Sequence, residues 1–132
     1  MTSKQNKNQE WKQKHGGLMT DFLSYLNSKS DRFILKGGTS LALFYGLDRF
    51  SEDLDFDGVT NKAKIKPFIA DFVKGKEIKV REAKNTHYGE RFILHYDKVF
   101  QLKIETSTRL ETVDPALFSN QNGVLVYILS LW

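Results

Sequence analysis

The feature that most constrains this chain is an alternation of acidic and apolar residues over Asp53–Gly58. Successive side chains of a β-strand point to opposite faces, so Leu54 and Phe56 are predicted to face a core while Asp53 and Asp55 share the other face. Cα atoms two positions apart in a strand lie roughly 6.6 Å apart. Two carboxylates at that spacing can share hard divalent cations such as Mg²⁺ or Mn²⁺. The segment therefore predicts a strand with a metal-binding face.

A glycine pair precedes this strand. The apolar run within Arg32–Lys36 does not alternate, which is typical of a buried strand, and Gly37-Gly38 then turns the chain into a short helix predicted over Thr39–Tyr45. A helix N-terminus favours phosphate, because free backbone N–H groups and the positive end of the helix dipole both face the anion. A phosphate cradle beside metal-binding carboxylates indicates nucleotide chemistry. The residues predicted to contact the nucleotide are Lys36, Gly37, Gly38, Thr39, Ser40, Arg49, Ser51 and Lys103.

A third carboxylate comes from the strand predicted over Val99–Ser107. Its apolar residues Leu102 and Ile104 face one way, and Lys103 and Glu105 face the other. In a two-metal site the cations lie about 3.5–4 Å apart, and Glu105 would complete the shell of the second cation. The predicted catalytic and metal-binding residues are Asp53, Asp55 and Glu105.

The remaining patterns predict an α+β fold. Residues 17–28 and 64–75 carry the i, i+3, i+4 apolar spacing of amphipathic helices. Strands are predicted over 77–83 and 91–96 in addition to 99–107, and the short connections between them favour antiparallel hairpins. Together these elements predict a mixed, largely antiparallel sheet with helices packed on one face.

The two ends of the chain carry weaker patterns. Residues 1–14 are polar and lysine-rich without an apolar period, so we expect a flexible segment there and one domain over 15–132. Residues 108–123, which include Pro115, are predicted to form a loop. Residues 124–131 form an apolar run, predicted to be a final strand or the start of a helix. An apolar chain end of this kind allows oligomerisation.

Composition narrows the class of protein. The 132 residues suffice for one domain, and the absence of cysteine excludes disulfides and thiolate metal sites. No apolar run approaches the roughly 20 residues needed to cross a bilayer, and the N-terminus lacks the apolar core of a signal peptide. We therefore expect a soluble cytoplasmic protein without a membrane partner.

The cations outnumber the acidic residues and concentrate in the middle of the chain. The net charge is +4 and the pI is about 9.2, which suits an anionic partner. Two interpretations of the basic middle stand side by side: a solvated lysine-rich surface, or a nucleic-acid contact surface. The residues concerned are Lys62, Lys64, Lys66, Lys74, Lys76, Lys79, Arg81 and Lys84.

The glycine turn and the acidic strand together resemble a known family signature. Leu35–Leu41, taken with Arg49-x-Ser51-x-Asp53-Leu54-Asp55-Phe56, is similar to the motifs of the AbiEii-type nucleotidyltransferases. These are the toxins of type IV toxin–antitoxin and abortive-infection systems, within the DNA polymerase β-like superfamily. Leu102–Glu105 resembles the later strand of that family, which bears its third acidic residue.

The resemblance covers roughly residues 17–131 and implies a nucleotidyltransferase-like domain. It implies transfer of a nucleoside monophosphate from a nucleoside triphosphate to an acceptor, RNA such as tRNA, with Mg²⁺ or Mn²⁺ as cofactor and an antitoxin protein as partner. Family members usually continue into a helical domain that is absent from this sequence. We therefore expect residues 15–132 to be the catalytic half.

Two alternatives remain open at this point. One is a catalytically incomplete remnant that binds nucleotide or antitoxin without turnover. The other is a Mg²⁺-dependent nuclease that uses Glu77 and Lys79 at the start of a strand. These alternatives differ in whether Glu77 and Lys79, or instead Glu105, converge with Asp53 and Asp55.

Overall fold

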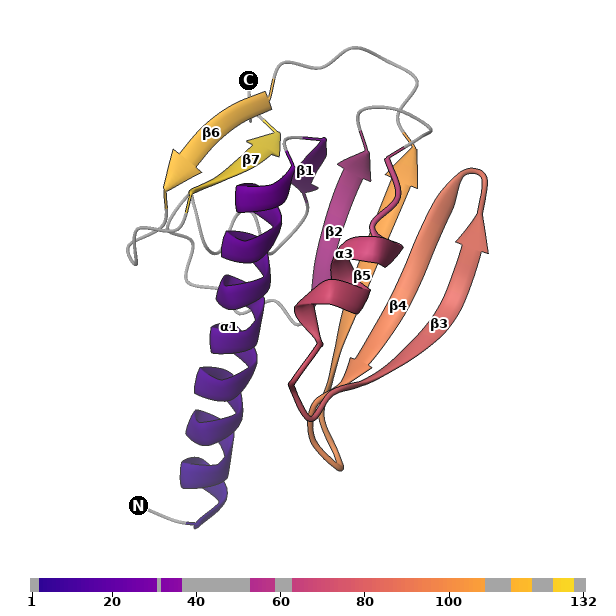
Figure 1. The fold of residues 1–132 in the computed structure, drawn as a ribbon. Helices are drawn as coiled ribbons and strands as arrows, with labels where there is room; N and C mark the ends of the chain where they lie inside the picture. Colours follow the sequence, from indigo (N-terminus) through magenta and orange to yellow (C-terminus); the bar gives the residue numbers. More distant parts are fainter. Residues whose placement is uncertain are drawn as a thin grey trace.

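The computed structural model describes residues 3–30, 32–36, 53–58, 63–108, 115–119 and 125–129. These residues form two helices and seven strands (Figure 1). In chain order the elements are α1 (Ser3–Lys29), β1 (Phe33–Lys36), β2 (Asp53–Gly58), α3 (Lys66–Phe72), β3 (Lys79–Thr86), β4 (Gly89–His95), β5 (Gln101–Thr108), β6 (Pro115–Ser119) and β7 (Leu125–Leu129).

The strands form one mixed sheet in the order β3-β4-β5-β2-β1-β7-β6. Parallel pairs join β2 to β5 and β1 to β7, and the other four neighbouring pairs are antiparallel. The predicted mixed, largely antiparallel sheet is therefore confirmed. Since β1 and β2 lie in the middle of the sheet, the motif residues that flank and occupy them are placed at its centre.

Both described helices pack on one face of the sheet (Figure 1). Phe22 of α1 is fully buried, and its ring lies edge-on to Phe72 of α3 and Phe56 of β2, with centroid separations of 5.1 and 6.4 Å. Such aromatic pairs contribute about 0.5–1.5 kcal/mol each beyond the area they bury. Leu54 and Phe56 point into this core, so Asp53, Asp55 and Asp57 lie on the opposite face.

The helix α1 begins at Ser3, so most of the segment 1–14, for which we expected flexibility, is helical in this structure. Lysine, glutamine and glutamate are good helix formers even without an apolar stripe. Tertiary contacts also hold this part of the helix. Lys14 Nζ lies 3.2 Å from Asp97 Oδ2, and His15, which is buried, has its Nδ1 2.5 Å from Tyr96 Oη. Neither described helix combines the length and apolar character needed to cross a membrane.

The C-terminal segment differs in part from its prediction. The strand β6 begins at Pro115, within the stretch predicted as a loop, and it is the edge strand of the sheet. Proline is tolerated at the first residue of an edge strand because the missing N–H is not needed for the ladder. The apolar run near the end forms β7, which confirms the strand alternative, and Ile128 of β7 lies opposite Leu35 of β1. The helix predicted over Thr39–Tyr45 lies outside the described residues.

The helix α3 has its N-terminus capped by a residue that the sequence analysis did not single out. Pro67 lies in the first turn, and no side chain of the helix itself caps it. Instead the buried Glu90 of β4 accepts hydrogen bonds from the backbone N–H of Ile65 at 2.9 Å and of Lys66 at 3.3 Å. A carboxylate in this position satisfies free N–H groups and interacts favourably with the helix dipole. Thr106 Oγ1 donates a further hydrogen bond, at 3.3 Å.

Candidate active site

The carboxylates predicted from the sequence meet where β2 runs parallel to β5. The register places Asp55 opposite Glu105 and Asp53 opposite Lys103. Leu54 between the two aspartates is fully buried on the helix face, whereas the four polar residues are partly exposed on the other face. The structure therefore brings Asp53, Asp55 and Glu105 together on one face, and their catalytic roles remain a prediction.

The carboxyl groups of Asp55 and Glu105 are hydrogen-bonded to each other. Burial raises the pKa of Asp55, and the hydrogen bond and negative charge of Glu105, followed by the charge of Asp53, raise it further. Burial alone would also raise the pKa of Glu105, but the hydrogen bond and charge of Arg91 lower it overall. Asp55 therefore takes up a proton more readily than a free aspartate does, whereas Glu105 favours its ionised form.

Three cations balance the acidic face. Lys103 Nζ lies 3.3 Å from Asp53 Oδ2, and Arg91 Nε forms an ion pair with Glu105. On the far side of the site, Lys36 Nζ lies 2.7 Å from Asp57 Oδ1. The side chain of Asp57 is only 5% exposed, which fits a structural role for Asp57 at the end of β2. Lys36, predicted to neutralise phosphate, is thus paired with a buried carboxylate in this structure.

Arg91 is the site residue that the sequence analysis missed. It lies on β4 directly opposite Glu105 in the antiparallel β4–β5 ladder. Its ion pair with Glu105 depends on that register, and a single sequence does not reveal which residue of one strand lies opposite which residue of the next. The predicted hairpin of β4 and β5 indicated only that the two strands pair, and not which residue lies opposite Glu105.

The donor set of this face fits a divalent cation. As the side chains lie, the described residues hold no group of three or more carboxylate or histidine side chains ready to bind a metal. The carboxylates are not assembled around a common point because Asp53 is directed to Lys103 and Glu105 to Arg91. Carboxylate oxygens are nevertheless the ligands that Mg²⁺ prefers. A divalent cation between Asp55 and Glu105 would offset the repulsion that raises the pKa of Asp55.

The segment predicted to bind phosphate starts and ends beside these carboxylates. Lys36, the last residue of β1, lies opposite Asp55 in the β1–β2 ladder, and the chain re-enters the sheet at Asp53. The intervening residues lie outside the described ranges, so their predicted contacts with nucleotide stay predictions. These residues are Gly37, Gly38, Thr39, Ser40, Arg49 and Ser51.

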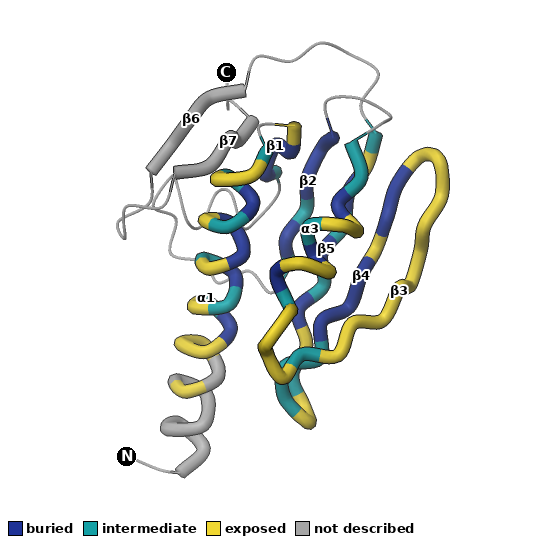
Figure 2. The backbone as a smooth tube through the Cα atoms, viewed as in Figure 1, coloured by how far each residue is buried: buried dark blue, intermediate teal, exposed yellow. Residues whose placement is uncertain are grey.

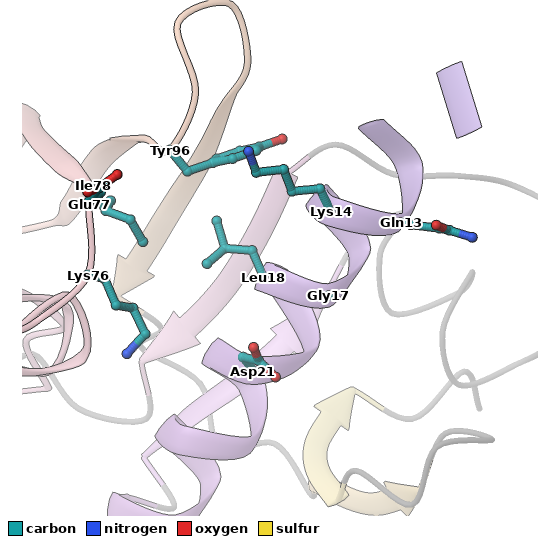
Figure 3. Close-up of a pocket in the computed structure, with 9 residues that line it drawn as sticks. All are labelled: Gln13, Lys14, Gly17, Leu18, Asp21, Lys76, Glu77, Ile78 and Tyr96. Atoms are coloured by element: carbon teal, nitrogen blue, oxygen red, sulfur yellow. The ribbon is translucent and has the colours of Figure 1, made fainter. Parts of the chain in front are cut away.

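The nuclease alternative is not supported by this geometry. Glu77 lines a groove of about 470 Å³ between α1 and the start of β3, together with Leu18 and Tyr96 (Figure 3). That groove is on the side of the sheet covered by α1, away from Asp53 and Asp55. Glu105, and not Glu77, is the carboxylate that joins the aspartates.

The mixed α+β sheet is similar to that of a putative nucleotidyltransferase from H. pylori, with a TM-score of 0.73 and 27% identity over 92% of this chain and 55% of that one. The family model for the nucleotidyl transferase AbiEii toxin of type IV toxin–antitoxin systems matches residues 21–120. The chain belongs to this AbiEii family, as the resemblance of its two motifs predicted.

Solved structures share this fold. The chain is similar to JHP933 from Helicobacter pylori, with a TM-score of 0.71 and 27% identity over 92% of this chain and 53% of that one. The fold is also similar to that of MenT4, a nucleotidyltransferase toxin from Mycobacterium tuberculosis H37Rv, with a TM-score of 0.52 and 18% identity over 86% of this chain and 47% of that one. No curated protein matches the sequence. The chain thus spans about half the length of the solved structures that it matches.

Proposed function

We propose that this chain is the catalytic part of a toxin that transfers a nucleoside monophosphate from a nucleoside triphosphate to an acceptor, with RNA such as tRNA as the acceptor. The observation that carries the proposal is the pairing of Asp55 with Glu105 across β2 and β5, with Asp53 beside them on the same face. Membership of the AbiEii family supports the same reaction.

In the proposed reaction an acceptor hydroxyl attacks the α-phosphorus of the triphosphate, a new phosphorus–oxygen bond forms, and the bond to the leaving pyrophosphate breaks. A divalent cation held by Asp53, Asp55 and Glu105 would supply charge neutralisation on the phosphates. Glu105, a partly exposed carboxylate on this face, would orient the attacking hydroxyl, whose proton passes to solvent. Lys103 and Arg91 are placed to interact with phosphate once they leave their carboxylate partners.

The proposed partners follow from this reaction and from the family. A nucleoside triphosphate is the donor, and an antitoxin protein is the partner expected of a toxin in a type IV system. Because triphosphates and tRNA are abundant in the cytoplasm, we expect the protein to act there.

The first test is transfer of label to RNA. The 132-residue chain is incubated with Mg²⁺, total RNA and each α-labelled nucleoside triphosphate in turn, beside Asp55→Asn and Glu105→Gln. Asp21→Asn is a matched control, because Asp21 is an exposed aspartate on α1. We expect label in RNA with the wild type and with Asp21→Asn, and a loss of at least about 100-fold with the two site variants.

If no protein transfers label, triphosphate binding by the same samples is measured next. Binding that Asp55→Asn weakens, without transfer, would contradict the proposed reaction and favour a remnant that binds nucleotide without turnover. Transfer that is equal in all four proteins would overturn the assignment of the site.

A further inference from the structure

The edge of the sheet next to the site carries a row of cations. The edge strand β3 is exposed at all eight positions, as Figure 2 shows along its whole length. Its basic residues Lys79, Arg81 and Lys84 form what we call the basic row. None of the three makes an ion pair with another described residue.

The strand register places the basic row on the carboxylate face. Residues directly opposite each other in an antiparallel pair point to the same face. Lys84 lies opposite Arg91 of β4, and Arg91 lies opposite Glu105 of β5, which in turn lies opposite Asp55. A single line therefore runs across four strands from Lys84 to Asp55. With neighbouring strands about 4.8 Å apart, that line is roughly 14 Å long.

A second line of facing residues lies beside the first and also joins the basic row to a carboxylate. Arg81 lies opposite Ile93 of β4, Ile93 lies opposite Lys103 of β5, and Lys103 lies opposite Asp53. Two parallel lines of side chains thus lead from the basic edge of the sheet to the predicted metal-binding carboxylates.

A β-bulge determines that Lys84 shares this face. The ladder is shifted between Glu82 and Lys84, so Ala83 has no partner on β4. Glu82 points to the helix face, where it forms an ion pair with Lys66 Nζ at 3.0 Å. In a regular strand Lys84 would point the same way as Glu82, and the extra residue turns it to the carboxylate face, as bulges commonly do.

This arrangement destabilises the pairing of β3 with β4, and no buried packing of the basic row offsets that loss. Lys84 and Arg91 are like charges directly opposite each other, which destabilises a strand pair. The basic row also lies on an exposed edge, so it covers no core. Beyond its end, at the hairpin turn, the side chain of Tyr88 is 73% exposed. An exposed aromatic beside unpaired cations is the combination that binds single-stranded nucleic acid, through base stacking and phosphate contacts.

We propose that the basic row binds the phosphate backbone of a single-stranded nucleic acid and directs its end along Arg91 to Glu105. The proposal rests on the proposed function, because it takes this strand to be the acceptor. A lone nucleoside triphosphate bound at the carboxylates would be too short to need cations on the edge strand. A polymer with one negative charge per nucleotide would use the whole row.

The test is binding of a fluorescein-labelled, unstructured RNA homopolymer, measured by fluorescence anisotropy in EDTA without nucleotide. The triple variant Lys79→Ser, Arg81→Ser, Lys84→Ser is compared with the control Lys12→Ser, Arg32→Ser, Lys98→Ser. The control removes the same charge from exposed residues outside β3. Each phosphate contact contributes about 0.7 to the slope of log K against log salt for a single strand, so the first variant should lower the slope by about 2. The control should retain the wild-type slope.

Equal weakening by both triple variants, or by neither, would overturn the proposal. Circular dichroism of each variant checks that the fold is retained. Failure of this proposal can be distinguished from failure of the proposed function. RNA binding through the basic row without nucleotide transfer would contradict the function alone. Transfer by the triple variant with an unchanged KM for RNA would contradict the basic row alone.

Discussion

Asp55 and Glu105 face each other across two parallel strands, and their environments shift the pKa values of the two carboxyl groups in opposite directions. Asp55 is more buried and has Asp53 two residues away, while Glu105 has the guanidinium of Arg91 against it. Two chemically similar groups are thereby made different, since the pKa of Asp55 is raised and that of Glu105 is lowered. Divergence of this kind within a carboxylate pair is common at functional sites.

The raised pKa of Asp55 predicts a pH-dependent effect of Asp55→Asn on stability. A carboxyl whose pKa is higher in the folded state contributes stability that is fully present below its unfolded value, 3.8, and is lost as the pH rises through the raised value. Asp55→Asn should therefore raise the thermal midpoint at pH 7.5 relative to wild type, in EDTA, and the difference should shrink as the pH is lowered toward 4.

Asp97→Asn is the control of opposite sign. The backbone N–H of Val99, followed by Lys14, lowers the pKa of Asp97. Its stabilising contribution is present above 3.8 and is lost as the pH falls through the lowered value. This variant should have a reduced thermal midpoint at neutral pH and approach wild type in acid. A midpoint of Asp55→Asn that stays below wild type at pH 7.5 would contradict the raised pKa of Asp55.

The ion pair between Arg91 and Glu105 predicts competition with metal. Arg91→Gln removes a cation that occupies the carboxylate, so Mn²⁺ should bind more tightly without nucleotide. Removing one charge about 4 Å away in water is worth about 1 kcal/mol, or about fivefold in affinity. Isothermal titration calorimetry measures it, and Arg91→Lys, which keeps the charge, should bind Mn²⁺ as the wild type does. Weaker binding by Arg91→Gln than by Arg91→Lys would count against this competition.

Glu90 is predicted to be a stability residue. Glu90→Ala leaves the N–H groups of Ile65 and Lys66 without their buried acceptor, which should lower the free energy of unfolding by about 1–3 kcal/mol. Glu90→Gln keeps one acceptor oxygen and should cost less. Urea denaturation gives both values, with Glu10→Ala on the exposed surface of α1 as the control. An equal loss for Glu10→Ala and Glu90→Ala would refute the capping role.

Replacing Gly89 or Gly17 with alanine should change the stability of the protein in opposite directions. A Cβ at Gly89 would lie 2.6 Å from the carbonyl oxygen of Thr106, so Gly89→Ala must displace backbone and should destabilise by about 1–3 kcal/mol. A Cβ at Gly17, inside α1, would have no neighbour within 4 Å, and Gly17→Ala should stabilise by about 0.5–1 kcal/mol. Thermal unfolding of the two variants gives the signs, and a destabilising Gly17→Ala would show that the gain in helix propensity is offset elsewhere.

The parts of the fold that follow a local period were predictable from the sequence. The alternation in Asp53–Gly58 has a period of two, which places Asp53 and Asp55 on one face whatever the rest of the chain does. The same period separates Glu105 from Leu102 and Ile104 in β5. The two motifs also sufficed to identify the family.

The parts that depend on contacts between distant segments were not predictable. Residues 3–14 of α1 lack an apolar stripe, and the contacts of Lys14 with Asp97 and of His15 with Tyr96 join segments far apart in the chain. The strand β6 begins at Pro115, which indicates a loop unless the strand is known to be at an edge. The partners of Glu105 and Glu90 could not be predicted for the same reason, because the position of β4 in the sheet determines both partners.

The parallel pairing of β2 with β5 has a consequence for the synthesis of the chain. The ribosome makes β2 first and then α3, β3 and β4 before it reaches β5. A nascent chain can pair β1 with β2 early, but Asp55 has no Glu105 opposite it until β5 has emerged. Chains interrupted before that point therefore lack the assembled carboxylate pair, and the chemistry proposed for this face becomes available only late in translation.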